Sequence, residues 1–153
     1  MNPSKLGSYY DDFVVGEVIK HQLSKTIFES DNNIFSLLTM NHHPLHTNMQ
    51  YAESSQHGKI LVVGTLVFSL VVGITVPDIS GKAIANLEYE NICHLSPVFI
   101  GDTIYAETRV LDKRVSVSNN DRGIVNVETI GINQLNIPVI SFKRKVLIKK
   151  REI

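Results

Sequence analysis

The most constraining feature of the sequence is one long apolar segment, residues 60–76. It holds small or hydroxyl-bearing residues, among them Gly64, Thr65, Ser69 and Gly73. A helix that is apolar on every side must be enclosed by protein or by lipid. At 17 residues the segment has only the shortest length that spans a bilayer, and nothing else in the chain indicates a membrane setting. We therefore expect a helix from about residue 61 to residue 75, buried inside the protein.

Four segments in the second half of the chain alternate polar and apolar side chains with the period of two that is typical of strands. They are residues 83–92, 103–113, 124–132 and 139–149. In the second, Ile104, Ala106, Thr108 and Val110 share one face, and in the fourth this face holds Ile140, Phe142, Val146 and Ile148. The connections are short and contain turn-forming residues, so we expect antiparallel neighbours.

The first half of the chain predicts shorter elements. Residues 18–28 can form one strand, and Ser30 resembles the N-cap of a helix that ends before Pro44. A further short helix is expected over residues 48–55. One buried helix and four antiparallel strands predict an α+β "hotdog" arrangement, in which a curled antiparallel sheet wraps around the helix. With 153 residues, the chain has the length of a single domain over residues 1–153.

The charge balance argues against one class of partner. The chain has 15 basic and 15 acidic residues, whereas a nucleic-acid-binding protein normally presents a basic face. We therefore expect no nucleic acid partner. The one basic cluster is interpreted as a solvated strand face rather than as an anion site. Its members are Lys143, Arg144, Lys145, Lys149, Lys150 and Arg151.

Two features bear on the compartment. Residues 1–10 lack the apolar core of a signal peptide, so we expect a cytoplasmic protein without a membrane partner. Cys93 is the only cysteine, which excludes an internal disulfide bond. Because no activating neighbour of Cys93 is visible in the sequence, a buried structural cysteine is favoured over a catalytic thiol.

The densest functional signal is a histidine-rich loop, in which His42, His43 and His46 fall within five residues. His42 and His46 have the spacing of a helical zinc pair, but Pro44 lies between them and no glutamate follows His42. We therefore expect no metal. A histidine can instead accept and donate a proton in one catalytic cycle. A helix-capping role is favoured for His42, whereas the residues alone leave both interpretations open for His46.

A second signal lies at the start of the apolar segment, where Gly58 and Gly64 occur. The first N–H groups of a helix lack helical partners and can stabilise a developing oxyanion. Glycine also lets a substrate carbonyl approach the backbone closely. The alternative is that Gly64 and Gly73 permit tight packing of the helix on the sheet, and this alternative is favoured for Gly73. No phosphate loop, dinucleotide fingerprint or serine nucleophile elbow is present in the sequence.

The loop and its surroundings resemble the MaoC-like dehydratase family. R-specific enoyl-CoA hydratases of that family carry Gly-Asp-x-Asn-Pro, an aliphatic residue and His, with Ala a few residues later. Here Met40-Asn41-His42-His43-Pro44-Leu45-His46 and then Ala52 occupy those places. Residues 10–17, the Ser30-Asp31 helix start and the stretch over residues 97–103 are similar as well. The resemblance spans nearly the whole chain, and Pro44-Leu45-His46 is its most specific part.

The resemblance implies addition of water to a 2-enoyl-CoA thioester and the reverse dehydration. It implies catalytic roles for Asn41 and His46, a thioester-polarising N–H at Gly64, and a substrate pocket with His43, Pro44 and Leu45. No cofactor is implied beyond the coenzyme A of the substrate. Family members commonly form homodimers with the acyl-CoA along the interface, so we expect a homodimer or larger assembly.

The chain departs from the family pattern at Met40, Asn41 and His43. Asparagine stands where the family has its catalytic aspartate, and a carboxamide can orient water but cannot take its proton. The form Met40-Asn41 before Pro44-Leu45-His46 resembles a branch that acts on methyl-branched C5 dicarboxyl-CoA thioesters such as mesaconyl-CoA or β-methylmalyl-CoA. We expect a working enzyme in which His46 handles the proton. The alternatives are a hotdog acyl-CoA thioesterase and a catalytically silent acyl-CoA-binding protein.

Overall fold

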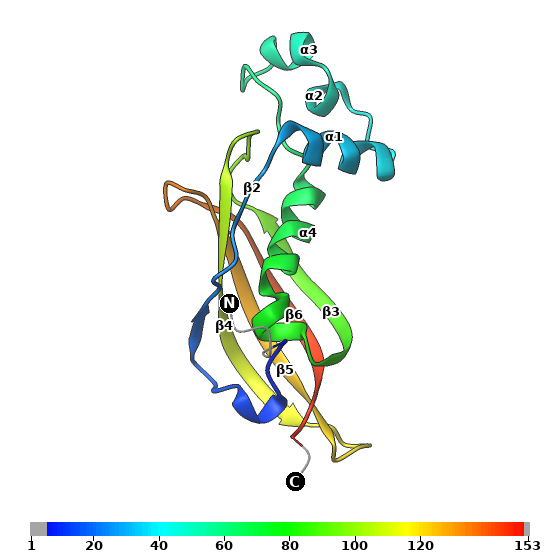
Figure 1. Ribbon diagram of the computed structural model, residues 1–153, viewed down its shortest axis with the longest axis vertical. Coiled ribbons are helices and arrows are strands. Elements are labelled where there is room, and N and C mark those ends of the chain that lie inside the picture. The colour runs from blue at the N-terminus through cyan, green and yellow to red at the C-terminus, as the bar shows by residue number, and fades with distance from the viewer. Residues whose placement is uncertain (1–5, 152–153) are drawn as a thin grey trace.

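An antiparallel sheet curls around one central helix in the computed structural model, which describes residues 6–151 (Figure 1). Part of the segment used for the signal-peptide prediction, residues 1–5, lies outside the described residues. The strands run in the order β1-β4-β5-β6-β3, and β2 pairs with β4. Their bounds are Val18–Lys20 (β1), Lys25–Thr26 (β2), Ala83–His94 (β3), Thr103–Val115 (β4), Arg122–Ile132 (β5) and Pro138–Lys149 (β6). This arrangement confirms the predicted α+β hotdog fold.

The central helix α4 spans Gly64–Thr75 and continues into a π-helical turn, Val76–Ser80. It begins three residues later than the sequence predicts. Leu61 instead forms an isolated bridge with Phe99, and the Val62 N–H donates to the Val98 carbonyl over 2.9 Å. The apolar segment over residues 60–76 therefore contains a short extended stretch followed by a helix. The side chains are apolar in both parts, and the backbone pairing of Leu61 and Val62 with the strand-like segment at residues 98–99 is what sets the extended part apart.

The core lies between α4 and the concave face of the sheet. The alternation in β4 and β6 is confirmed, because the side chains predicted to share a face are all buried. On the helix side the buried residues are Leu66, Val67, Val71, Ile74 and Thr75. Most of these are bulky aliphatic side chains that pack at the density of a protein interior.

The opposite side of α4 is left uncovered by the described residues. Thr65, Ser69 and Gly73 recur every four residues and form an exposed stripe. A Cβ built on Gly73 would meet no heavy atom of residues 6–151 within 4 Å, so the prediction that this glycine permits tight packing of the helix on the sheet is wrong. The small residues fall on the side that faces away from the sheet.

The N-terminal half differs from the sequence prediction in two elements. The expected strand over residues 18–28 is divided into β1 and β2, and between them the His21 side chain bonds to Asp78 and Thr108 at 2.7 and 2.8 Å. Helix α1 spans Glu29–Leu38 and so begins before Ser30, which is not its cap. The Asp31 carboxylate performs the capping, because it accepts a hydrogen bond from the Phe28 N–H at 2.8 Å.

Two short helices follow α1, and together the three cover one end of α4 (Figure 1). They are α2, Pro44–Thr47, and α3, Met49–Glu53. A single 3-10 turn, Tyr10–Asp12, precedes β1. The predicted helix over residues 48–55 is present as α3, although it is shorter than expected because Ser54 already acts as its C-cap.

Two predictions about single residues are wrong. Cys93 is exposed rather than buried, and it lies one residue before the end of the edge strand β3. Arg144 does not belong to a solvated strand face, since it is only 1% exposed and its Nη2 donates to the Thr75 hydroxyl at 3.1 Å. Burial lowers the pKa of this guanidinium from its ordinary value. Among the described residues, no helix is long and apolar enough to cross a membrane.

Candidate active site

The loop between α1 and α2 is shaped by its backbone. Met40 adopts a left-handed conformation with φ of 59°, directly after the C-cap of α1. The following Asn41 N–H then returns to the Ser36 carbonyl at 3.0 Å. Pro44 occupies the first turn of α2, where its missing N–H costs nothing, and the His43 ring caps that helix by accepting from the Leu45 N–H. The loop thus carries Asn41 to the end of one helix and His46 to the end of the next.

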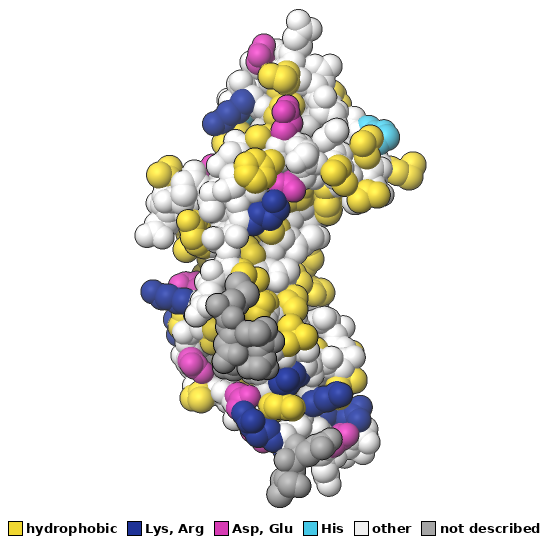
Figure 2. All heavy atoms as spheres, viewed as in Figure 1, with side chains coloured by type: hydrophobic (Ala, Val, Ile, Leu, Met, Phe, Trp, Pro, Cys, Tyr) yellow, Lys and Arg dark blue, Asp and Glu magenta, His cyan; other side chains and the backbone are white. Residues whose placement is uncertain are grey.

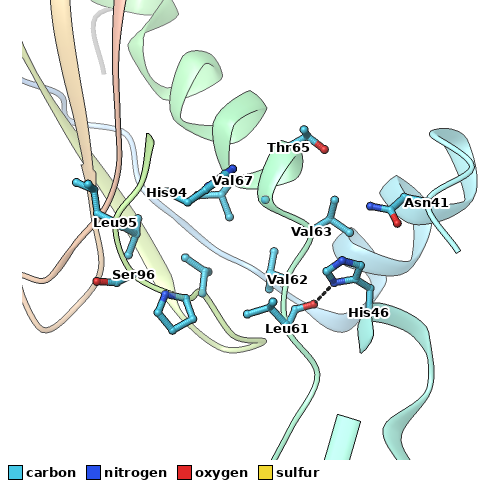
Figure 3. A pocket seen from close by; sticks show the side chains of 14 residues that line it. Asn41, His46, Leu61, Val62, Val63, Thr65, Val67, His94, Leu95 and Ser96 are labelled. Carbon is cyan, nitrogen blue, oxygen red and sulfur yellow. Dashed lines mark hydrogen bonds between the residues drawn. The ribbon is translucent and has the colours of Figure 1, made fainter. Parts of the chain in front are cut away.

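The His46 ring has a defined tautomer. Its Nδ1 lies 2.6 Å from the Leu61 carbonyl oxygen, as the dashed line in Figure 3 marks. A carbonyl oxygen only accepts, so Nδ1 must carry the hydrogen. The Nε2 lone pair of neutral His46 is then available to take a proton, and the Leu61 carbonyl can stabilise the charged ring that results. This is the arrangement required of a general base.

The first turn of α4 supplies hydrogen-bond donors. The N–H groups of Gly64 and Thr65 have no hydrogen-bond acceptor among the described residues, whereas the Leu66 N–H donates to the Val63 carbonyl. Free N–H groups at a helix N-terminus, with the helix dipole behind them, favour negative charge on a ligand. Such groups are suited to polarising a thioester carbonyl.

A cavity of about 570 Å³ brings these parts together. Three of the residues proposed from the sequence, Asn41, His46 and Gly64, line it. In Figure 3, Asn41 and His46 lie on one side of the first turn of α4, and His94 lies on the other. The remaining wall is largely apolar and includes Val62, Val63, Val67, Val98 and Val139. A polar end and an apolar wall suit a short acyl group.

The other three residues proposed from the sequence are not among those that line this cavity. His43, Pro44 and Leu45 instead form the cap and first turn of α2, and the His43 ring makes edge contacts with His46 and Tyr51 at centroid distances of 6.0 Å. Their role as pocket residues stays a prediction. In the structure these three residues form the start of the short helix that carries His46.

His94 is a cavity residue that sequence reasoning missed. It ends β3, and a Cβ built on Gly64 would lie 2.8 Å from two atoms of its ring. A side chain on Gly64 would therefore require the His94 ring to move. A single histidine at the end of a predicted strand has no spacing pattern, so nothing in the sequence could indicate this contact.

Asn32 is the second missed residue. It lies in the first turn of α1, only 2% exposed, and its carboxamide bonds to the backbone of both His46 and Val63. The sequence places it in an amphipathic helix without any sign that its side chain reaches the loop 14 residues later. No group of three or more His, Cys, Asp or Glu residues within residues 6–151 is arranged to hold a metal ion.

Comparison with known proteins identifies the family. A family model described as the MaoC like domain matches residues 12–132. The chain belongs to the MaoC-like dehydratase family. It is 36% identical over 146 residues to a mesaconyl-CoA hydratase from Cereibacter sphaeroides, covering 95% of this chain and 42% of that protein. It is 32% identical over 105 residues to an (R)-specific enoyl-CoA hydratase from Rhodospirillum rubrum, covering 67% and 69% of the two chains.

A solved structure supports the same family assignment. A protein described as a MaoC domain protein dehydratase, from Chloroflexus aurantiacus, superposes with a TM-score of 0.90 and 32% identity, covering 99% of this chain and 43% of that one. The chain thus spans less than half the length of the first curated relatives it matches. Asn41, which the sequence resemblance puts where the family has its aspartate, lines the same cavity as His46.

Proposed function

We propose that this chain catalyses the addition of water to a 2-enoyl-CoA thioester, and the reverse dehydration, as a carbon–oxygen lyase. The observation that carries the proposal is a cavity shared by His46 and the first turn of α4, in which neither the His46 Nε2 nor the Gly64 and Thr65 N–H groups have a hydrogen-bond partner among the described residues. The first group can move a proton, and the second can hold the charge that forms on a thioester oxygen. The hydratases among the relatives support this reaction class.

The hydration step follows from these positions. The thioester carbonyl accepts hydrogen bonds from the Gly64 and Thr65 N–H groups, which draws electron density from the β-carbon. The Asn41 carboxamide orients a water molecule, and Nε2 of His46 takes one of its protons as the oxygen bonds to the β-carbon. The electron pair of the double bond moves toward the carbonyl and forms an enolate. Protonated His46 then returns the proton to the α-carbon, so that the histidine ends neutral.

The proposed substrate is a methyl-branched C5 dicarboxyl-CoA thioester such as mesaconyl-CoA. The similarity to a mesaconyl-CoA hydratase and to a β-methylmalyl-CoA dehydratase supports it. The cavity is compatible with such a substrate, because His94 adds a hydrogen-bond donor for the free carboxylate opposite His46. Coenzyme A enters only as part of the substrate, and the cytoplasmic location expected from the sequence stays a prediction.

The test is a hydration assay on crotonyl-CoA, a methyl-branched enoyl-CoA and mesaconyl-CoA. We expect loss of the ultraviolet absorbance of the conjugated thioester without release of free thiol, with mesaconyl-CoA giving the highest kcat/KM. Release of coenzyme A thiol would instead indicate a thioesterase. Binding of all three thioesters without turnover would indicate a silent acyl-CoA-binding protein.

We also propose that the protein forms a homodimer. Strand β3 is at one edge of the sheet, and among the described residues no further strand pairs with its outer side. Ile84, Leu87 and Ile92 on this strand are exposed. Figure 2 shows further apolar side chains near α1, where Ile34 and Leu38 are exposed as well. An unpaired edge with exposed apolar residues favours pairing with a second copy.

A further inference from the structure

We propose that Asn32 is a positioning residue for the reaction. Its buried carboxamide ties the backbone of His46 to the entry of α4, so that the base and the oxyanion donors keep a fixed relative position. The inference rests on the proposed hydratase function, and it adds a residue from α1 to a site otherwise built from the loop, from α2, from α4 and from the end of β3.

Two hydrogen bonds define the tie. The Asn32 Nδ2 donates to the His46 carbonyl over 3.0 Å, and the Asn32 Oδ1 accepts from the Val63 N–H over 3.0 Å. The orientation of the amide is fixed by its partners. A flipped amide would set its NH2 group against the Val63 N–H and its oxygen against the His46 carbonyl, which would leave both bonds unmade.

The partners of Asn32 are adjacent to the reacting groups in the chain. Val63 directly precedes Gly64, whose N–H begins the proposed oxyanion site. The same extended segment also receives the His46 ring, through the Leu61 carbonyl. His46 is therefore held to this segment twice, directly by its ring and through Asn32 by its backbone. Loss of the second tie leaves the ring bond as the one side-chain connection between them in the described structure.

The burial of Asn32 indicates that an asparagine is required at this position for its hydrogen bonds to His46 and Val63. Asparagine is a weak helix former, and a buried amide is unfavourable unless it is bonded. Asn32 is 2% exposed on the inner face of α1, whereas its neighbour Asn33 is exposed and makes no side-chain hydrogen bond in the described structure. The helix itself has no need of an amide at position 32, because Asp31 already supplies the cap.

The test is a double-mutant cycle between Asn32→Leu and His46→Gln, with Asn33→Leu as the matched control on the exposed face. In the wild-type background we expect Asn32→Leu to lower kcat about 10- to 100-fold, because small misplacements of a catalytic group have effects of this size. KM should change little. In the His46→Gln background the same substitution should lower kcat far less, because Asn32 acts through His46. Asn33→Leu should leave kcat unchanged in both backgrounds.

A merely structural role gives different results. Equal losses in the two backgrounds, or an unchanged kcat in folded Asn32→Leu, would overturn the inference. If Asn32→Leu does not fold, Asn32→Asp replaces it, since a carboxylate still accepts from Val63 but cannot donate to the His46 carbonyl. Asn32→Asp with wild-type kcat would likewise overturn the inference.

A second measurement separates this inference from the proposed function. The ¹⁵N spectrum of the histidine rings reports whether His46 remains protonated at Nδ1 and bonded to Leu61, whatever reaction the protein catalyses. We expect the His46 signals to shift toward a mixture of tautomers in Asn32→Leu and to stay in place in Asn33→Leu. Unchanged His46 signals in Asn32→Leu would contradict the positioning role, even if no thioester is hydrated.

Discussion

At the scale of the residue, the proposed chemistry depends on His46. Replacing His46 with alanine removes the group that moves the proton, and we expect kcat on the best substrate to fall at least ~10²-fold, the low end for general acid–base catalysis. KM should change little, because the side chain acts mainly in the transition state. His42→Ala is the control, since His42 is exposed and does not line the cavity. Wild-type turnover by His46→Ala would show that the mechanism is wrong.

Asn41 gives a prediction about pH. It lines the same cavity as His46, and by the sequence resemblance it stands where the family has its catalytic aspartate. In Asn41→Asp a carboxylate faces the histidine and stabilises its protonated form. Because the base must be unprotonated to accept from water, the acidic limb of the kcat profile should move to higher pH. Asn41→Ala has no charge and should lower kcat without moving that limb. If the wild type, Asn41→Asp and Asn41→Ala have the same acidic limb, residue 41 does not influence the protonation of His46.

Met40 gives a prediction about stability. It holds a left-handed backbone conformation, with φ of 59°, and its side chain is 82% exposed. That conformation costs a non-glycine residue roughly 1 kcal/mol, so Met40→Gly should raise the free energy of unfolding by about that amount. Leu38→Gly is the control, because Leu38 is similarly exposed but helical, and there glycine should lower stability by roughly 1 kcal/mol. Urea unfolding of both variants distinguishes the two signs.

At the scale of the element, the start of α1 depends on Asp31. The Phe28 N–H and then Lys25 hold the pKa of this carboxyl below its usual range. A lowered folded-state pKa means that the stabilisation is present above the ordinary aspartate pKa of about 3.9 and is lost as the pH falls through the folded value. Asp31→Ala should therefore cost about 1 kcal/mol near pH 7, with the difference from wild type shrinking below about pH 4. Glu29→Ala is the control, because Glu29 makes no capping bond in the described structure; an equal loss in both variants would argue against capping.

The elements also show why parts of the structure could be predicted and others not. In β4 and β6, polar and apolar side chains alternate, and this alternation specifies which side chains face the core. Such a short-range period can be recognised in a single sequence. The start of α4 could not be placed, because Leu61 and Val62 are apolar whether they are helical or extended. Asn32 and His94 were missed for a different reason. Each acts through a contact between distant segments, and no local spacing encodes such a contact.

At the scale of the whole molecule, the edge strand and the open face of α4 belong to one surface. Phe68 of α4 packs against Tyr89 of β3, with ring centroids 5.1 Å apart, so the helix lies next to the sheet edge. If two copies pair along β3 about a twofold axis, their α4 helices come to lie side by side. The exposed stripe of Thr65, Ser69 and Gly73 then has small residues where two helices approach. The proposed homodimer would thus bury the β3 edge and the exposed stripe of α4 in one interface.

Sedimentation equilibrium with a charge placed on β3 tests this dimer. Leu87 is 49% exposed on the edge strand, and Leu87→Lys would set two like charges near each other across the interface. We expect the wild type to have the mass of two chains at micromolar concentration and Leu87→Lys to dissociate at least ~10-fold more readily. Leu135→Lys makes the same change on a residue that is 69% exposed in the turn between β5 and β6, and it should leave the mass unchanged. A wild-type mass of one chain throughout that range would refute the dimer. Equal dissociation of the two variants would place the interface away from β3.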